Sequence, residues 1–433
     1  IREASTMPAT LLSNVMVLDA TGAEPFPGEV LVEGNRIRKV AKGRGQIGRE
    51  NAARVIDGGG MTLMPGMTEG HCHISFTGVA QPFELGMIPP EEHTLKTAAN
   101  AKLLFECGFT SVYCAASAKP RLDVVVRNAV NAGELVGPRI RAASPEMVAT
   151  GGLGDERMLH IHRESFALIA DGPEEVRRAV RTCIREGVDN IKLNVSGDDF
   201  YPNSPGGVTT YMDDEVRMAC EIAHEFGKQV ATHSRSSGSV KLSVRNGVDC
   251  IYHCEHADAE ALDMMEAAKD RIFVGPAVGL LYNTVHEAAP WGITEEVVQK
   301  LNMRRNLEIT CEVYREVRKR GIRAVIGGDY GFAWTPQGTN ARDLIHFNKL
   351  FGYPPMECIQ LATMNGGQLM RLGGELGQVK EGWLADLLLV DGDPLRDLSL
   401  LVGPDHLAMI MKDGRIFKDP ASYTAAARKV AAE

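Results

Sequence analysis

The middle of the chain alternates between short apolar runs and helical patterns, and this alternation restricts the folds that the chain can adopt. Eight apolar runs predict strands, at residues 67–73, 110–116, 140–147, 190–196, 229–234, 249–254, 271–278 and 323–329. Helical patterns lie between most of them, including residues 174–185, 213–226, 237–245 and 307–320. Eight strand–helix units over roughly 300 residues predict an α/β fold with a (β/α)8 TIM barrel. A doubly wound open sheet is the alternative, although no Gly-x-Gly-x-x-Gly motif follows an early strand.

The two ends of the chain predict short strands instead. Apolar runs at residues 10–18 and 28–40 lie near the start, and runs at 385–390 and 406–417 lie near the end. Such short strands need each other to bury an apolar face, so we expect both ends to form one small β-sandwich domain. The predicted organisation is a β-sandwich of residues 8–64 and 376–420, a barrel of residues 65–375 and a tail helix of residues 421–433.

Charge and composition disfavour several classes of protein. The chain has 47 Lys and Arg against 56 Asp and Glu residues, a formal net charge of −9, which disfavours nucleic acid and anionic membranes as partners. It holds no run of about 18 apolar residues, as a membrane span requires. No signal-type apolar stretch precedes Met7, where we expect the natural start. The nine cysteines are scattered without a Cys-x-x-Cys pair, so we expect reduced thiols in a cytoplasmic protein.

The first predicted strand ends in two histidines. Functional side chains of a barrel come from the C-terminal ends of its strands. Because side chains alternate along a strand, His71 and His73 project to the same face while Cys72 points the other way. Two imidazoles side by side suit a divalent metal. Two histidines hydrogen-bonded in a loop are the structural alternative.

The fourth predicted strand carries a lysine on its inner face. Ile191, Leu193 and Val195 share the face that packs against helices, so Lys192 points into the barrel. A lysine there is costly unless it is paired or chemically changed. Next to a dication it can lose its proton and react with CO₂, which gives a carbamate that bridges two metals. A lysine that reaches a buried carboxylate is the alternative, and it is favoured when Lys192 is considered alone.

Three further strand ends complete the constellation. His233 and His253 end the fifth and sixth predicted strands, one strand–helix unit apart, and Asp329 follows two glycines at the end of the eighth. Alone, each histidine reads as a satisfied core residue and Asp329 as a helix cap. It is improbable that all these alternatives hold together, so the set predicts a metal centre.

Six sequence stretches resemble the amidohydrolase superfamily, in particular its binuclear-metal branch related to imidazolonepropionase and prolidase. The resemblance covers nearly the whole chain, and the stretches that carry it are residues 63–73 (LMPGMTEGHCH), 133–139 (GELVGPR), 150–155 (TGGLGD), 191–197 (IKLNVSG), 247–253 (GVDCIYH) and 384–394 (LADLLLVDGDP). The resemblance implies six metal ligands, His71, His73, Lys192, His233, His253 and Asp329.

The resemblance also assigns roles to these residues. The first two histidines and Asp329 would hold the more buried ion, the later two histidines the more exposed one, and Lys192 would bridge both as its carbamate. The ions implied are two divalent metals, most often Zn²⁺, with a hydroxide between them. Asp329 would accept the proton of that hydroxide and deliver it to the leaving nitrogen.

The chain departs from the branch at positions expected to face the substrate. Leu153 and Cys254 replace a histidine and a glycine that are common there, and Arg235, Tyr252 and Tyr330 also differ. Arg235 would bind a substrate carboxylate bidentately or be a surface arginine. The residues expected to form an aromatic wall are Phe76, Tyr252, Tyr330 and Trp334.

Two more segments are candidates for substrate contact. His160 and His162 would polarise the scissile carbonyl or lie free on the surface. Residues 197–213, with two prolines and several glycines, predict a loop over the site.

These features predict a metal-dependent hydrolase that cuts an amide-type C–N bond of a small molecule. The open alternatives are a hydrolase of aryl ureas or carbamates and a hydrolase of dipeptides or N-acyl amino acids. A mononuclear deaminase is disfavoured because such enzymes usually lack the bridging lysine, and a non-catalytic assembly protein because all six ligands are present. By analogy with relatives we also expect a homo-oligomer.

Overall fold

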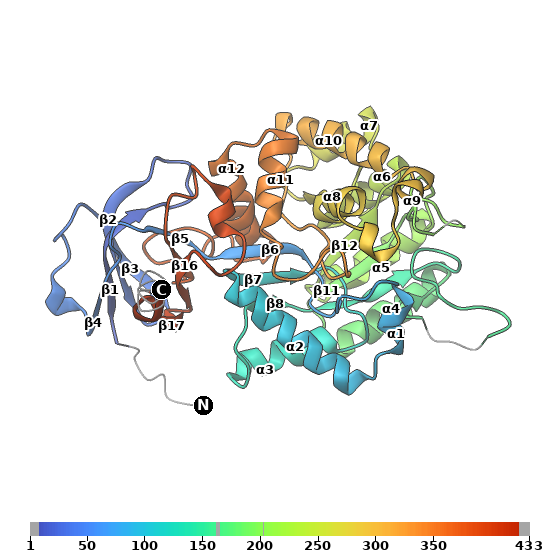
Figure 1. The fold of residues 1–433 in the computed structure, drawn as a ribbon. Helices are drawn as coiled ribbons and strands as arrows, with labels where there is room; N and C mark the ends of the chain where they lie inside the picture. Colours follow the sequence, from blue (N-terminus) through green and yellow to red (C-terminus); the bar gives the residue numbers. More distant parts are fainter. Residues whose placement is uncertain (1–7, 162–164, 202, 424–433) are drawn as a thin grey trace. The chain divides into compact units, whose positions relative to one another are not determined.

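The computed structural model describes residues 8–161, 165–201 and 203–423 (Figure 1). They divide into two compact units. The first lies within Ile1–Thr68, Leu104–Ser111 and Tyr353–Glu433, and the second within Glu69–Leu103 and Val112–Gly352. Within the described ranges, no helix is long and apolar enough to cross a membrane. Most of the tail helix predicted for residues 421–433 lies outside the described residues.

The first unit is built on one sheet that takes strands from both ends of the chain. Its order is β17-β16-β15-β5-β1-β2-β3, and β4 pairs with β1. The strands are β1 (Thr10–Val17), β2 (Phe26–Glu33), β3 (Arg36–Lys42), β4 (Arg54–Asp57), β5 (Thr62–Pro65), β15 (Leu387–Val390), β16 (Leu407–Lys412) and β17 (Arg415–Lys418). The antiparallel pairing of β5 with β15 joins the two ends of the chain.

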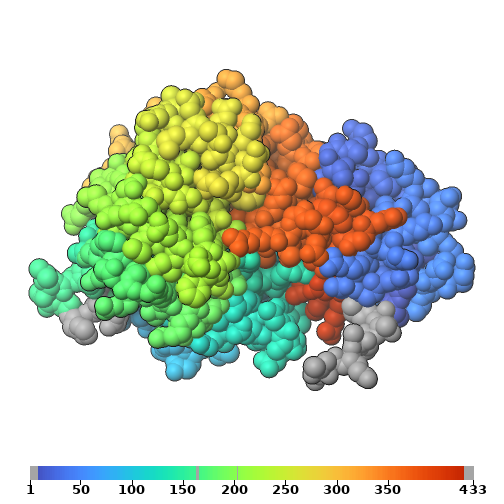
Figure 2. Space-filling view, turned by 180° about the vertical axis from the view of Figure 1, so that it is seen from behind, coloured from blue at the N-terminus to red at the C-terminus, as the bar shows by residue number. Residues whose placement is uncertain are grey.

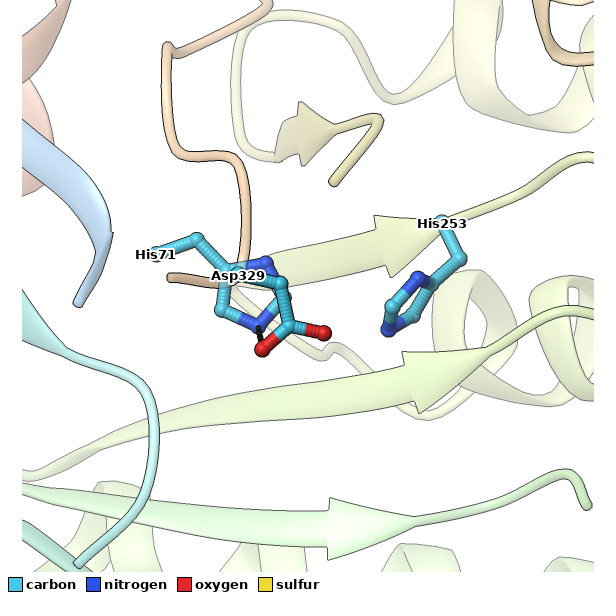
Figure 3. Close-up of side chains that lie close together, drawn as sticks. All are labelled: His71, His253 and Asp329. Carbon is cyan, nitrogen blue, oxygen red and sulfur yellow. Dashed lines mark ion pairs between the residues drawn. The ribbon is translucent and has the colours of Figure 1, made fainter. Parts of the chain in front are cut away.

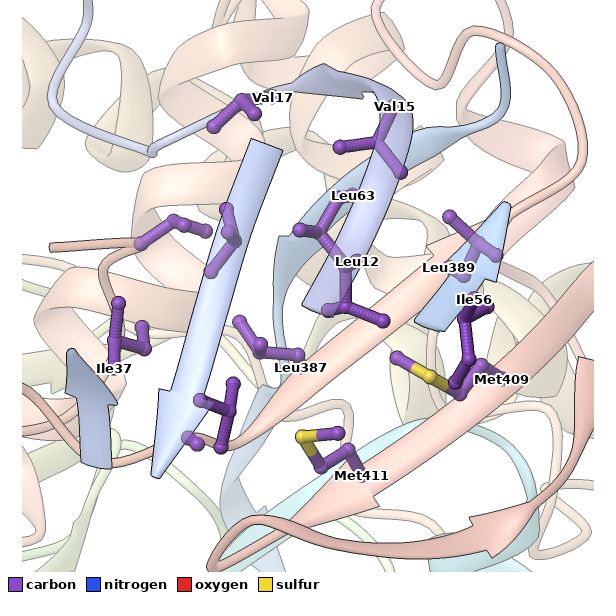
Figure 4. Packing of buried hydrophobic residues seen from close by; sticks show 14 of the residues in the cluster. Leu12, Val15, Val17, Ile37, Ile56, Leu63, Leu387, Leu389, Met409 and Met411 are labelled. Atoms are coloured by element: carbon purple, nitrogen blue, oxygen red, sulfur yellow. The ribbon is translucent and has the colours of Figure 1, made fainter. Parts of the chain in front are cut away.

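A single apolar cluster explains why the two ends pair. It combines N-terminal side chains such as Leu12 and Leu63 with C-terminal ones such as Leu389 and Met409, all buried (Figure 4). Neither end has enough apolar surface to bury a face alone, so pairing removes the apolar faces of both from water. Short helices complete this unit, η1 (Arg49–Asn51), α12 (Pro355–Gln360), η3 (Leu361–Asn365), α13 (Gly366–Leu369) and η4 (Leu398–Leu401).

The second unit alternates strands and helices. A six-stranded sheet has the order β10-β9-β11-β12-β13-β14, with neighbouring strands parallel. Its strands are β9 (Ala143–Val148), β10 (Leu168–Ile169), β11 (Asn190–Asn194), β12 (Gln229–Ser234), β13 (Cys250–His253) and β14 (Phe273–Gly275). A three-stranded sheet contains β6 (Met67–Cys72), β7 (Phe109–Cys114) and β8 (Arg139–Arg141). Strands β11, β12 and β13 are buried along their whole length, as expected of parallel strands covered on both faces.

The helices follow the strands in the alternating order expected from the sequence. They are α1 (Phe83–Met87), α2 (Pro90–Glu106), α3 (Leu122–Ala132), α4 (Gly172–Arg185), α5 (Asp213–Glu225), α6 (Ser237–Arg245), α7 (Ala259–Ala267), α8 (Val278–His286), η2 (Ala289–Trp291), α9 (Glu295–Lys300), α10 (Met303–Lys319) and α11 (Arg342–Phe351). The yellow-green and yellow helices α6 and α7 lie at the surface in Figure 2.

The eighth predicted strand, residues 323–329, differs from the expectation. Only one parallel bridge forms there, between Val274 and Ala324. Two further hydrogen bonds flank it, from Val325 N to Val274 O at 2.9 Å and from Gly70 N to Ile326 O at 3.0 Å. The ladder stops because the backbone then leaves the extended conformation, with Asp329 in the left-handed region at φ 62°. The segment is therefore an irregular connection that ends in a carboxylate.

Candidate metal centre

Three buried side chains from distant parts of the chain meet in the second unit. His71 comes from β6, His253 ends β13, and Asp329 is the last residue of the irregular segment 323–329. One ligand atom of each lies within 4.8 Å of the others (Figure 3). Two imidazoles and a carboxylate at this separation suit a divalent metal ion.

The other predicted ligands lie around this group. The Nε2 atom of His73 lies 3.0 Å from Asp329 Oδ1, and the ring centroids of His233 and His253 are 4.1 Å apart. Lys192 is 1% exposed and lines the same cavity as His73, His233 and Asp329. The structure therefore brings together all six residues that the sequence singled out as ligands.

Strand register explains how His233 and His253 become neighbours. The parallel pairing of β12 with β13 aligns Ser234 with His253, so both histidines stand at the same edge of the sheet. The backbone of His253 is left-handed at φ 76°, as is that of Asp329. Non-glycine residues rarely adopt this conformation, and such strain is concentrated at functional sites.

The electrostatics of the group favour metal binding. Burial lowers the pKa of His71, His233 and His253 well below the ordinary value, so these imidazoles are neutral, the form that ligates metals. Burial by itself would raise the pKa of Asp329, but the hydrogen bond from the ring of His73 opposes this effect, and the pKa is held below its usual range, so the carboxylate is ionised.

Buried polar atoms without hydrogen-bond partners test whether these residues fit a divalent metal ion. Both ring nitrogens of His71 and of His253 are buried and have no hydrogen-bond partner. Leaving such groups unsatisfied costs about 1–3 kcal/mol each. A metal ion accepts a lone pair from one nitrogen of each ring, so the donors present fit a divalent ion.

Aromatic rings and carbonyls orient the imidazoles. His71 stacks on Tyr252 with ring centroids 3.7 Å apart, and His73 stacks on Phe76 at 4.2 Å. The Tyr252 hydroxyl donates to Gly70 O at 2.6 Å. The ring of His73 also hydrogen-bonds a backbone carbonyl through Nδ1, which leaves Nε2 toward Asp329. Stacking thus fixes the plane of both rings, and the hydrogen bond fixes which nitrogen of His73 is presented.

The predicted substrate contacts separate into two groups. Phe76 and Trp334 line the cavity. Tyr252 and Tyr330 are fully buried and are engaged elsewhere, since Tyr330 donates to Asp343 Oδ1 at 3.1 Å. Tyr252 stacks on His71 and Tyr330 hydrogen-bonds Asp343, so both rings are used within the buried surroundings of the site and do not line the cavity.

The remaining candidates have different placements. Arg235 is neither a surface residue nor a free cation, because it is 2% exposed and lies between Asp198 and Glu255. His160 is exposed, and His162 lies outside the described residues.

The cavity beside the ligands measures about 410 Å³. This volume falls within the range of sites for small organic ligands. Sequence reasoning missed several of its lining residues, among them Glu146, Asp198, Phe200, Tyr201, Leu280 and Phe332. Glu146 lies near the end of the third predicted strand, and this position could have indicated that it lines the cavity. Asp198, Phe200 and Tyr201 belong to the loop that was predicted to cover the site.

Comparison with known proteins places the chain in a family. The pattern of the Amidohydrolase family matches residues 62–417. The chain belongs to this family. It is a hydrolase that acts on carbon–nitrogen bonds, and the amidohydrolases generally use divalent metals.

Individual relatives of this amidohydrolase are distant but match over most of their length. It is 25% identical to an ochratoxinase of Aspergillus niger over 379 residues, which cover 83% of this chain and 76% of that protein. It is 22% identical to an imidazolonepropionase of Rubrobacter xylanophilus, with 90% of each chain covered. A solved structure of a Xaa-Pro dipeptidase with bound methionine superposes with a TM-score of 0.85 at 25% identity, over 95% of this chain and 100% of that one.

Metal analysis tests the centre directly. The purified amidohydrolase should contain about two divalent ions per chain, because six ligands of this type fill two sites. His71→Ala and His253→Ala should each reduce the metal content by at least about one ion, since each removes an otherwise unpartnered imidazole. His406→Ala, at an exposed position outside the cluster, is the matched control and should retain full content. A folded protein without metal after incubation with Zn²⁺ would contradict the assignment.

Proposed function

We propose that this amidohydrolase is a binuclear metal-dependent enzyme that hydrolyses an amide-type bond next to an aromatic or other apolar group. The observation that carries the proposal is the apolar wall of the cavity that holds the ligands. Phe332 stacks on Trp334 with centroids 5.4 Å apart, and Phe76 meets Phe332 edge to face at 5.5 Å. Phe200 and Leu280 extend this wall. Burying an aryl group against it contributes about 25 cal/mol per Å² of apolar surface.

The six polar side chains supply the chemistry of the proposed reaction. Divalent ions bound there would polarise the scissile carbonyl and lower the pKa of water. Asp329 is 9% exposed and borders the cavity, so its carboxylate accepts the proton of the attacking water and returns it to the leaving nitrogen. The neutral imidazoles of His71, His233 and His253 would hold such ions without adding positive charge of their own.

Lys192 completes the proposed ligand set as a carbamate. Burial lowers the pKa of its amine, although Glu146 opposes this shift. A neutral amine is the form that adds to CO₂: the new N–C bond forms, one proton leaves, and the lysine acquires a carbamate whose single negative charge is shared by two oxygens. We propose Zn²⁺ as the metal because it accepts imidazole, carboxylate and carbamate ligands alike.

We further propose that the second unit closes into a (β/α)8 barrel and that the two chain ends form a β-sandwich. Support for the barrel comes from the parallel order of β9 to β14 and from the irregular eighth segment, which hydrogen-bonds to both β14 and Gly70. A closed barrel places all six ligands at one rim. None of the nine cysteines forms a disulfide and all are buried, which supports a cytoplasmic location.

A hydrolysis screen with the Zn²⁺-loaded enzyme tests the proposed function. It includes dipeptides, N-acyl amino acids, anilides, phenylureas and carbamates, each paired with an analogue in which methyl replaces the aryl group. The aryl member of the preferred pair should have a kcat/KM at least about tenfold higher, because the apolar wall binds only that member well. Ammonia release from amino-heterocycles alone would identify a deaminase instead. Equal rates for both members of every pair would exclude the apolar recognition.

A further inference from the structure

Arg235 has a different environment from the one expected of a substrate ligand. It lies two residues after His233, and its guanidinium lies between two buried carboxylates. Nη2 lies 2.8 Å from Asp198 Oδ2, and Nη1 is in contact with Glu255 Oε1. One positive charge is thus shared by two negative ones, with no net positive charge left for a substrate carboxylate.

Each carboxylate belongs to a different structural element. Glu255 lies two residues after His253, so its ion pair with Arg235 joins the tips of the same strands that present His233 and His253. The backbone supports this connection, since His256 N donates to Arg235 O at 3.1 Å. Arg235 N in turn donates to Ser196 Oγ at 2.8 Å. The Arg235 side chain is therefore anchored at its base to rigid strand ends.

Asp198 belongs to the loop that forms one side of the cavity. Its Oδ1 accepts a hydrogen bond from Phe200 N at 3.0 Å, and its carbonyl accepts one from Tyr201 N at 2.8 Å. Asp198, Phe200 and Tyr201 all line the cavity. The carboxylate that Arg235 holds is thus the one that orders the turn presenting two aromatic rings.

The aliphatic part of the Arg235 side chain also packs against the loop. A methyl group built on Gly206 would lie 3.1 Å from Arg235 Cδ, so the loop backbone packs directly on the arginine side chain at this point. Gly206 N donates to Asp199 Oδ1 at 2.9 Å, and Asn306 Nδ2 of α10 donates to Asp199 Oδ2 at 2.5 Å. Arg235 therefore contacts the loop at two separate places, Asp198 and Gly206.

We propose that Arg235 is a positioning residue that fixes Phe200 and Tyr201 in the lining of the cavity that holds the candidate metal ligands. In this proposal Arg235 does not bind a substrate carboxylate. The role deepens the proposed function, because Phe200 belongs to the apolar wall that would receive the apolar part of the substrate. The ion pairs keep one loop conformation populated, so that binding does not have to order the loop.

Limited proteolysis tests the proposal without relying on catalysis. Chymotrypsin can cut after Phe200 only when the loop opens locally. In Arg235→Met and Asp198→Asn, cleavage there should be at least about tenfold faster than in the parent protein. Arg235→Lys keeps the positive charge but lacks the planar guanidinium that contacts two carboxylates at once, so its cleavage rate should be intermediate. Arg245→Met is the control, because Arg245 is an exposed arginine that pairs with Asp213 at 3.2 Å. Unchanged cleavage at Phe200 in folded Arg235→Lys and Asp198→Asn would overturn the proposal.

Kinetics with a substrate from the screen distinguish the two roles of Arg235. If Arg235 positions the wall, Arg235→Lys should raise KM by about tenfold with little change in kcat, equally for an N-acyl amino acid and its primary amide. A rise in KM for the N-acyl amino acid without a rise for its primary amide would show that Arg235 binds the substrate carboxylate, and it would overturn the proposal. The proteolysis result does not depend on finding a substrate, so failure of the proposed function and failure of this inference are separate outcomes.

Discussion

Replacement of Asp329 by asparagine is expected to lower kcat by a factor of about 10²–10⁴, the usual contribution of a general acid–base group. The amide has nearly the same shape as the carboxylate but cannot accept a proton from water. It retains an oxygen that can ligate a metal, so the Asp329→Asn protein should still bind metal. The assay compares kcat and metal content of the variant with those of the parent enzyme on the preferred substrate.

The control for this substitution is an aspartate far from the cavity. Asp263 on α7 is exposed and pairs with Arg320 at 2.6 Å, so Asp263→Asn should leave kcat unchanged. A near-normal kcat for Asp329→Asn with full metal content would remove the proton transfer from the mechanism. Loss of metal together with kcat would show instead that Asp329 acts mainly as a ligand.

Replacement of Lys192 by alanine should lower kcat/KM by at least about 100-fold, because the substitution would remove the ligand that we propose is shared by two ions. Short carboxylic acids such as acetate and propionate should restore part of the activity. They fit the space left by the side chain and provide two oxygens on one carbon, as a carbamate does. The measurement is the initial rate as a function of added acid, at constant ionic strength.

Two comparisons make the lysine experiment specific. Lys319→Ala removes an exposed lysine from the end of α10 and should neither lose activity nor respond to acetate. Equilibration of the parent protein with ¹³CO₂ should give a carbamate signal in NMR that is absent from Lys192→Ala. Unchanged activity of Lys192→Ala would exclude the carbamate bridge.

Much of the second unit follows from the sequence because its strands are buried on both faces. The run at 229–234 coincides with β12 (Gln229–Ser234), and the predicted helix at 237–245 with α6 (Ser237–Arg245). The eighth run was the exception, since composition cannot reveal that its backbone leaves the extended conformation before Asp329. Apolar content predicts burial, whereas a ladder also requires hydrogen bonds from a neighbour.

The clustering of the candidate ligands was predictable for a related reason. His71, Lys192, His233 and His253 each lie in a predicted strand or end one, and parallel strands put equivalent ends at one edge. Alternation along each strand then selects which residues face the same side. Local periodicity and chain direction suffice for this step, so no knowledge of distant contacts was needed.

The sequence by itself determined the alternating strands and helices and the polar residues at the strand ends, because both depend on short-range periodicity. Only the tertiary structure decided what surrounds those residues. Tyr252 stacks on His71 although the two residues are far apart in the sequence, and Arg235 is paired by Asp198 from a loop and by Glu255 from the segment that follows β13. Whether a side chain lines the cavity or supports a ligand depends on such distant partners. These contacts form only when the whole chain packs, and no local pattern encodes them.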